Sequence, residues 1–183
     1  MSVLKNKRYT SPMKYVSNGY EIEKYSLDFT KRLTVKNSRL FQDPIKRLAM
    51  FQADTAYIAN EIFPTNRAEF LVRRIILGLS MATLHALDKR MADVYEVLMV
   101  NPSEAFNRKN GKPIPKAEAE QILDTMAEDL GCMIDLQDTL IKGVRDSDRS
   151  RAAKLPPDDS RLTSTLTDAF TAMSKSLITL FIN

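Results

Sequence analysis

Long amphipathic segments bounded by proline dominate this chain of 183 residues. Within them, apolar residues recur every three or four positions, which is the spacing of an α-helix that buries one face. The chain holds 5 glycines and no tryptophan, a composition that disfavours a glycine-rich all-β domain. Its length allows a sizeable core in one domain without a disulfide or a structural metal. The pattern therefore predicts an all-α protein.

Two helices are expected in the first third of the chain. The first covers residues 11–35 and starts with a serine N-cap followed by proline, although Gly19 in its middle weakens it. The second is expected to begin at Asp43-Pro44, again a cap residue before a proline. It ends before Pro64, because the residue preceding a proline disfavours helical backbone angles.

Two more helices are expected in the remainder of the chain. The third, residues 66–100, starts with Asn66 and has Glu69 three positions later, which is the pattern of a capping box. The fourth begins at Pro115 and ends near Arg145. It carries acidic residues in its first turns and basic residues in its last, the order that the helix macrodipole favours.

These segments and their short connections predict an up-down four-helix bundle over residues 11–147. Residues 1–10 are expected to form an extended basic arm. Residues 148–183 are interpreted as a polar linker and a C-terminal extension, in which residues 162–182 have helical apolar spacing and could form a fifth, docking helix. The breadth of the apolar stripes hints at oligomerisation.

The net charge of +4 conceals a basic first quarter. Residues 1–47 contain 11 Lys or Arg against 4 Asp or Glu, which gives +7, whereas residues 100–144 are acidic at −3. A basic arm on a nearly neutral body is typical of a chain that meets a polyanion or an acidic protein surface. A solvated, soluble surface explains the same charges equally well.

The chain is poor in the residues that carry most enzyme chemistry. It has one histidine, His85, and one cysteine, Cys132, so a Cys₂His₂ zinc site and a histidine-containing di-iron site are excluded. His85 is interpreted as a structural or partner-facing histidine, and Cys132 as a buried, inert thiol. Asp135 and Asp138 are expected to form a solvated face. No glycine-rich phosphate loop occurs, so neither catalysis nor a cofactor or metal is predicted.

No apolar run reaches the roughly 18 residues that a membrane span needs. The first eight residues are charged and lack the apolar centre of a secretory signal. A cytoplasmic protein without a membrane partner is therefore expected.

Basic side chains are the remaining candidates for a binding site. Those selected as RNA- or partner-binding are Lys5, Lys7, Arg8, Lys46, Arg47, Arg67, Arg73 and Arg74. In an antiparallel bundle, residues 31–47 would form a patch at one pole and residues 67–74 a patch at the other. Because Arg73 and Arg74 are adjacent on a helix, they point about 100° apart. One is expected to reach a partner, and the other a subunit interface or a neighbouring helix.

Three short motifs carry a resemblance to a known family. They are residues 1–8 (MSVLKNKR), residues 20–25 (YEIEKY), and residues 59–66 (ANEIFPTN) followed by Glu69 and Arg73-Arg74. Over residues 1–145 the chain resembles the accessory variability determinants of diversity-generating retroelements and, more distantly, the ribosomal-RNA intervening-sequence proteins. It departs from the family at Leu4, where a proline is expected, and residues 146–183 have no counterpart.

This resemblance implies a small basic four-helix bundle that assembles into a ring, typically a pentamer. The ring would bind a reverse transcriptase and its template RNA and support error-prone copying of the template into cDNA, with all the chemistry in the reverse transcriptase. The basic residues that match are Lys5, Lys7, Arg8, Arg67, Arg73 and Arg74.

Two other functions are consistent with the residues. One is a structural or interaction bundle, for example a phage or mobile-element assembly component, that does not bind nucleic acid. The other is a small enzyme that uses the carboxylates of the fourth helix.

Overall fold

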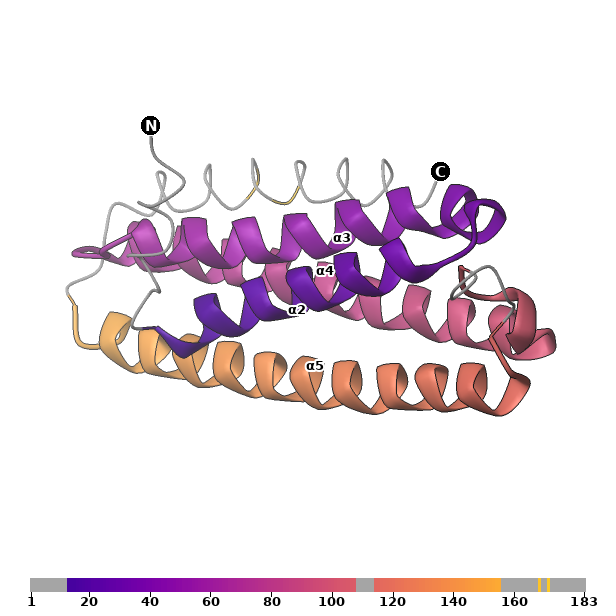
Figure 1. The fold of residues 1–183 in the computed structure, drawn as a ribbon. Coiled ribbons are helices and arrows are strands. Elements are labelled where there is room, and N and C mark those ends of the chain that lie inside the picture. Colours follow the sequence, from indigo (N-terminus) through magenta and orange to yellow (C-terminus); the bar gives the residue numbers. More distant parts are fainter. Residues whose placement is uncertain (1–12, 108–113, 156–167, 169–170, 172–183) are drawn as a thin grey trace, which may run out of the picture.

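The computed structural model describes residues 13–107 and 114–155, together with positions 168 and 171 (Figure 1). Over the two continuous ranges it contains four long helices and one short 3-10 turn: α2 (Lys14–Arg32), α3 (Val35–Glu61), α4 (Arg67–Val100), η1 (Pro102–Glu104) and α5 (Lys116–Ala152). Successive long helices run antiparallel (Figure 1). The expected all-α up-down four-helix bundle is confirmed.

The antiparallel order creates two poles. At one of them, here called the arginine pole, α2 and α4 begin and α3 and α5 end (Figure 1). The opposite pole holds the end of α2, the start of α3, the end of α4 with residues 101–107, and the start of α5. At that second pole, an isolated antiparallel bridge between Leu33 and Phe106 joins the residue after α2 to the connection after η1.

The capping box at the start of α4 is confirmed. The side-chain oxygen of Asn66 accepts a hydrogen bond from the backbone N–H of Glu69 at 2.9 Å. The Glu69 carboxylate in turn accepts from the backbone N–H and the hydroxyl of Thr65, at 2.6 and 2.9 Å. These hydrogen bonds favour the ionised carboxylate and lower the pKa of Glu69.

The start of α3 differs from the prediction. The helix begins at Val35, and Pro44 lies inside it rather than at its first turn. Contacts with the connection after α4 hold the early turns: the Thr34 N–H donates to the Ala105 carbonyl at 3.0 Å, and the Asn37 amide donates to the same carbonyl at 3.2 Å. These tertiary bonds offset the backbone hydrogen bond that proline cannot donate.

The end of α5 also differs. The helix continues to Ala152, so residues 148–152 belong to the bundle and not to the expected linker. The reason is tertiary: Asp148 is buried against α4, a partner that lies far away in the sequence. The predicted arm, residues 1–10, and most of the C-terminal extension lie outside the described residues. Asp168 and Thr171, the two described positions there, are helical and exposed.

A polar layer crosses the bundle between a large apolar cluster and a smaller one near the arginine pole. The Gln137 amide donates to the carbonyl of Tyr15, and the Gln52 amide donates to the carbonyl of Gly19, each at 2.8 Å. The Ser80 hydroxyl donates to the carbonyl of Gln52 at 2.8 Å. This layer links all four long helices of the described bundle through side chain to backbone bonds, so it fixes their register.

Gly19 has a packing role in this layer. A Cβ atom there would lie 3.3 Å from the Gln137 amide nitrogen and 3.5 Å from the Gln52 side-chain oxygen. The missing side chain lets α2 approach α3 and α5 closely, and α2 continues through this position unbroken.

By length and composition alone, α4 could cross a membrane, a criterion that core helices of soluble proteins also meet. Its buried residues extend from Ala68 near its start to Leu98 near its end.

Candidate nucleic-acid interface

An open groove of about 460 Å³ lies at the arginine pole, between the first turns of α4 and the last turns of α5. Its lining residues are Arg67, Phe70, Leu71, Arg74, Asp148, Arg149, Ala152 and Ala153. We call this feature the arginine groove. Three arginines from two helices lie around it, and the remaining lining is mostly apolar.

The antiparallel packing explains why cations gather at this place. The last turn of α5 contains Arg149 and Arg151. The partial negative charge at a helix C-terminus stabilises such cations. Arg67, at the first position of α4, donates from Nε to the carbonyl of Ala152 at 3.2 Å, a carbonyl at the end of α5 that also accepts from the backbone N–H of Leu155. Each helix end therefore helps to position the cations of the other.

Arg73 and Arg74 diverge, as their helical spacing predicts. Arg73 is only 6% exposed and points toward α5, where its Nε lies 3.4 Å from the Asp148 carboxylate. Arg74 lines the arginine groove, and within the described part of the chain it forms no ion pair. The structure therefore places Arg73, selected from the sequence as a binding residue, inside the bundle beside Asp148 and not on its surface.

The Arg73–Asp148 pair belongs to a buried polar cluster behind the groove. Burial raises the pKa of Asp148, and the guanidinium groups of Arg73 and Arg151 oppose that shift. Burial likewise raises the pKa of Tyr15, again opposed by Arg73, and the Tyr15 hydroxyl donates to the Asn60 side chain at 3.4 Å. The cluster holds Arg73 in place and so sets the helix face on which Arg74 emerges.

The aromatic ring in the groove is not free to stack on a base. Phe70 is 5% exposed, and the guanidinium of Arg151 lies 5.5 Å from its ring centroid. The groove therefore offers cationic N–H donors to an anion but no aromatic platform. Such a surface suits phosphate oxygens, which carry no sequence information.

The other selected cations do not join this groove. Lys46 and Arg47 are exposed, but they lie three turns inside α3 instead of at its start. Arg47 is roughly 20 Å along the helix axis from the end of α3 at the arginine pole, at 1.5 Å per residue. Lys5, Lys7 and Arg8 lie outside the described residues.

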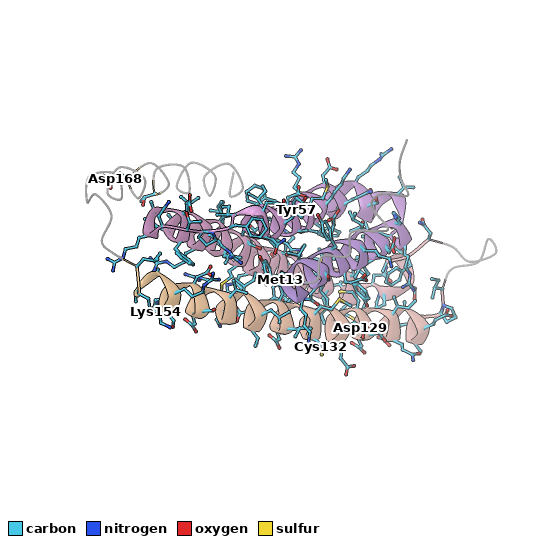
Figure 2. The ribbon with its side chains drawn as sticks, turned by 90° about the vertical axis from the view of Figure 1, so that its left-hand side faces the viewer. Met13, Tyr57, Asp129, Cys132, Lys154 and Asp168 are labelled. Atoms are coloured by element: carbon cyan, nitrogen blue, oxygen red, sulfur yellow. The ribbon has the colours of Figure 1, made fainter. Side chains whose placement is uncertain are left out.

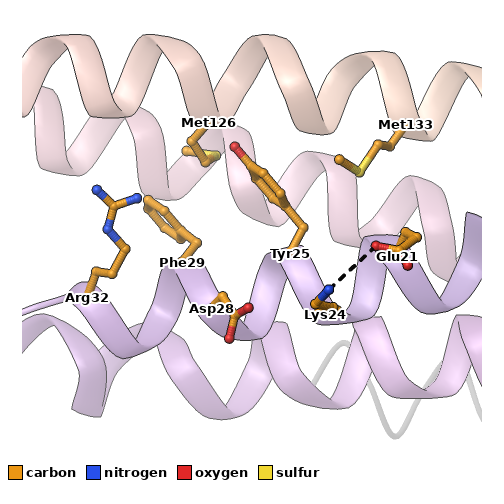
Figure 3. Close-up of a pocket in the computed structure, with 8 residues that line it drawn as sticks. All are labelled: Glu21, Lys24, Tyr25, Asp28, Phe29, Arg32, Met126 and Met133. Carbon is orange, nitrogen blue, oxygen red and sulfur yellow. Dashed lines mark ion pairs between the residues drawn. The ribbon is translucent and has the colours of Figure 1, made fainter. Parts of the chain in front are cut away.

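Some cations near the opposite pole are matched by carboxylates or rings, whereas Lys36 and Arg39 at the start of α3 are exposed and form no ion pair among the described residues. Figure 3 shows a pocket between α2 and α5 in which Lys24 and Glu21 form an ion pair at 4.0 Å. Lys31 pairs with Asp28 at 2.8 Å, and the Arg32 guanidinium lies 5.8 Å from the Phe106 ring centroid. The lining of this pocket has two cations and two carboxylates, whereas the arginine groove has three arginines and one aspartate. One of the groove arginines, Arg149, also pairs with Asp146 at 3.6 Å.

Within the same pocket, Tyr25 donates to the Asp129 carboxylate at 3.0 Å. Burial and the neighbouring Asp129 together raise the pKa of Tyr25 to about 12, so the hydroxyl stays protonated near neutral pH.

The single cysteine and the single histidine are both at the surface. Cys132 is exposed, which contradicts the expected buried thiol; Figure 2 shows it on the outer side of α5. The His85 side chain is 60% exposed, and its Nε2 lies 3.4 Å from the Asp138 carboxylate. Asp138 also pairs with Lys142 and is half-buried, whereas Asp135 is exposed and fits the predicted solvated face. No metal-binding group of three His, Cys, Asp or Glu occurs among the described residues.

The sequence interpretation missed Phe70, Arg149 and Arg151. The signal available for the arginines is the basic run from Arg145 to Lys154, which straddles the expected helix end and the expected linker. Continuing the fourth helix through this run would place it beside the start of the third helix.

Comparison with protein-family models, curated proteins and solved structures finds no match to the chain. The resemblance to accessory variability determinants therefore stays a hypothesis that rests on short sequence motifs.

Proposed function

We propose that this bundle is a non-catalytic RNA-binding accessory subunit that contacts the phosphate backbone of a structured RNA through the arginine groove. The observation that carries the proposal is the convergence of Arg67, Arg74 and Arg149 from two helix ends, with Arg74 unpaired within the described chain. Guanidinium groups bind phosphate oxygens through paired N–H donors, and they stay charged at every physiological pH.

The groove predicts the kind of RNA recognition. Because Phe70 is covered and the exposed donors are guanidinium groups, binding is expected to depend on phosphate position and helix shape more than on base sequence. The basic residues of the arm, Lys5, Lys7 and Arg8, would add further phosphate contacts.

The biological setting of the proposal comes from the sequence resemblance. In that setting, the subunit binds a reverse transcriptase and its template RNA in the cytoplasm and supports error-prone cDNA synthesis in a diversity-generating retroelement. Self-assembly into a ring, most simply a pentamer, is part of the same proposal. The alternative is a phage or mobile-element assembly bundle that binds protein without nucleic acid.

The proposal is tested by comparing two single substitutions in α4. Arg74→Gln removes a groove cation, whereas Arg90→Gln removes an exposed arginine of the same helix outside the groove. We expect Arg74→Gln to weaken binding to a structured RNA roughly tenfold, the equivalent of about 1.4 kcal/mol for one charge-assisted contact. Arg90→Gln is expected to change the dissociation constant by a factor below about two.

Binding is measured by fluorescence anisotropy with several RNAs of equal length and different sequence. A similar loss for all of them upon Arg74→Gln supports backbone contact. If the parent chain binds no RNA, or if the two variants behave alike, the arginine groove is not an RNA interface. The assembly-bundle alternative then takes its place.

A further inference from the structure

The outward face of the α2–α3 pair carries exposed apolar side chains. From α3 these are Leu40, Met50, Tyr57 and Ile58, each between 38% and 60% exposed, and Tyr20 of α2 is 41% exposed. Their spacing along α3 places them on the side away from its buried residues. Figure 2 shows Tyr57 on the opposite side of the bundle from α5. We call this surface the α3 face.

We propose that residues 162–180 of the same chain cover the α3 face as an amphipathic helix antiparallel to α3. The sequence of this segment supplies the required stripe, since its apolar residues recur at helical spacing: Leu162, Leu166, Ala169, Phe170, Met173, Leu177 and Leu180. Asp168 and Thr171, the described positions within it, are helical and exposed, and both lie off that stripe.

The dimensions of the two surfaces agree. Residues 162–180 would form a helix of about 28 Å, and the stretch of α3 from Leu40 to Ile58 has the same length, at 1.5 Å per residue. The continuous described chain ends at Leu155 beside the arginine pole, where α3 also ends. A segment that leaves this pole and returns along the bundle must therefore run antiparallel to α3.

The connection is long enough. Within the described bundle α3 and α5 do not contact one another, so they are a diagonal pair. Diagonal helices lie about 14 Å apart when neighbours pack at about 10 Å. Ala153, Lys154 and Leu155 form hydrogen-bonded turns, so the free connection runs from Leu155 to Leu162. It can span up to about 24 Å when extended, about 10 Å more than the diagonal distance to α3.

The absence of tryptophan from the chain allows a clean test. Tyr57→Trp places a single tryptophan on the α3 face of the full chain. If residues 162–180 cover it, its emission is blue-shifted and shielded from acrylamide to the same degree at all protein concentrations. In this background, Phe170→Asp puts a charge on the apolar stripe, whereas the neighbouring Thr171→Asp adds the same charge on an exposed position.

We expect Phe170→Asp to shift the emission to the red and to raise the acrylamide quenching constant by a factor of about two or more, with no change for Thr171→Asp. Leu177→Ser is a milder stripe variant and should give a smaller shift in the same direction. Circular dichroism confirms that the bundle remains helical.

A solvent-like tryptophan emission in the Tyr57→Trp chain overturns the proposal. Equal effects of Phe170→Asp and Thr171→Asp on that emission overturn it as well. Shielding that grows with protein concentration, together with a doubled mass by light scattering, assigns the α3 face to a second copy instead. This test does not involve RNA, so its outcome is independent of the function proposed for the arginine groove.

Discussion

At the scale of single residues, the Arg73–Asp148 pair distinguishes the buried Arg73 from its neighbour Arg74, which lines the arginine groove. Both side chains are more than nine-tenths buried, and they join the start of α4 to the end of α5. A buried ion pair adds little stability relative to apolar residues of the same size. Loss of one partner is destabilising, because it leaves the other charge buried and unpaired. The pair therefore fixes how the two helix ends meet.

A double-substitution cycle tests this role. Arg73→Met alone is expected to lower the free energy of unfolding by about 3–5 kcal/mol, because Asp148 is left without its partner. The combined change Arg73→Met with Asp148→Leu should recover most of that loss. Urea unfolding of the four chains in the cycle measures the coupling between the two positions. Additive single effects would show that the two charges do not interact in the folded protein.

The sequence predicts local features of this site better than distant ones. The Asn66–Glu69 cap depends on residues three apart, so its chemistry is visible in the sequence. The divergence of Arg73 and Arg74 follows from the helical period alone. Which of the two turns inward depends on Asp148, a residue far along the chain in a stretch that looks like a polar linker, and no local pattern reveals that partner.

At the scale of the secondary-structure element, α3 shows how tertiary contacts override a local start signal. Asp43-Pro44 has the pattern of a helix start, yet the helix extends about two and a half turns before it. Those early turns are fixed by bonds from Thr34 and Asn37 to residues 104–105. The prediction failed because these partners come from a distant part of the sequence, the connection that follows α4.

Replacing this proline should stabilise the protein. Pro44→Ala restores an N–H donor inside α3 and removes the clash of the ring with the preceding turn. Part of the gain is cancelled, because alanine leaves the unfolded chain freer than proline does. We expect a net increase of about 1–2 kcal/mol in the free energy of unfolding. Asp43→Ala, at the adjacent exposed position, is the matched control and should change it by less than about 0.5 kcal/mol.

Thermal and urea unfolding of these two variants give the comparison. A destabilised Pro44→Ala chain would mean that proline is required to shape α3 at this point, contrary to the packing described here.

At the scale of the whole molecule, α5 separates charge along its length. Residues 117–138 of α5 contain seven acidic residues and no lysine or arginine, whereas the arginines of α5 lie from Arg145 onward, beside the start of α4. A polyanion would be repelled by the acidic part of α5 and attracted to the arginine pole. The four-helix topology was predictable from apolar spacing and proline positions, but this polarity required knowing which helix ends lie together.

The salt dependence of RNA binding tests the central claim most directly. A chain that binds phosphates through the arginine groove should lose affinity steeply as salt rises, because each neutralised phosphate releases counterions. Replacing Arg67, Arg74 and Arg149 with Gln should flatten the plot of log affinity against log salt by roughly two to three units, about 0.7–0.9 for each phosphate that is no longer neutralised. The same change at Lys36, Arg39 and Arg90, three exposed cations outside the groove, should alter the slope by less than about one unit. An unchanged slope in the groove variant, or equal flattening in both triple variants, would contradict the account.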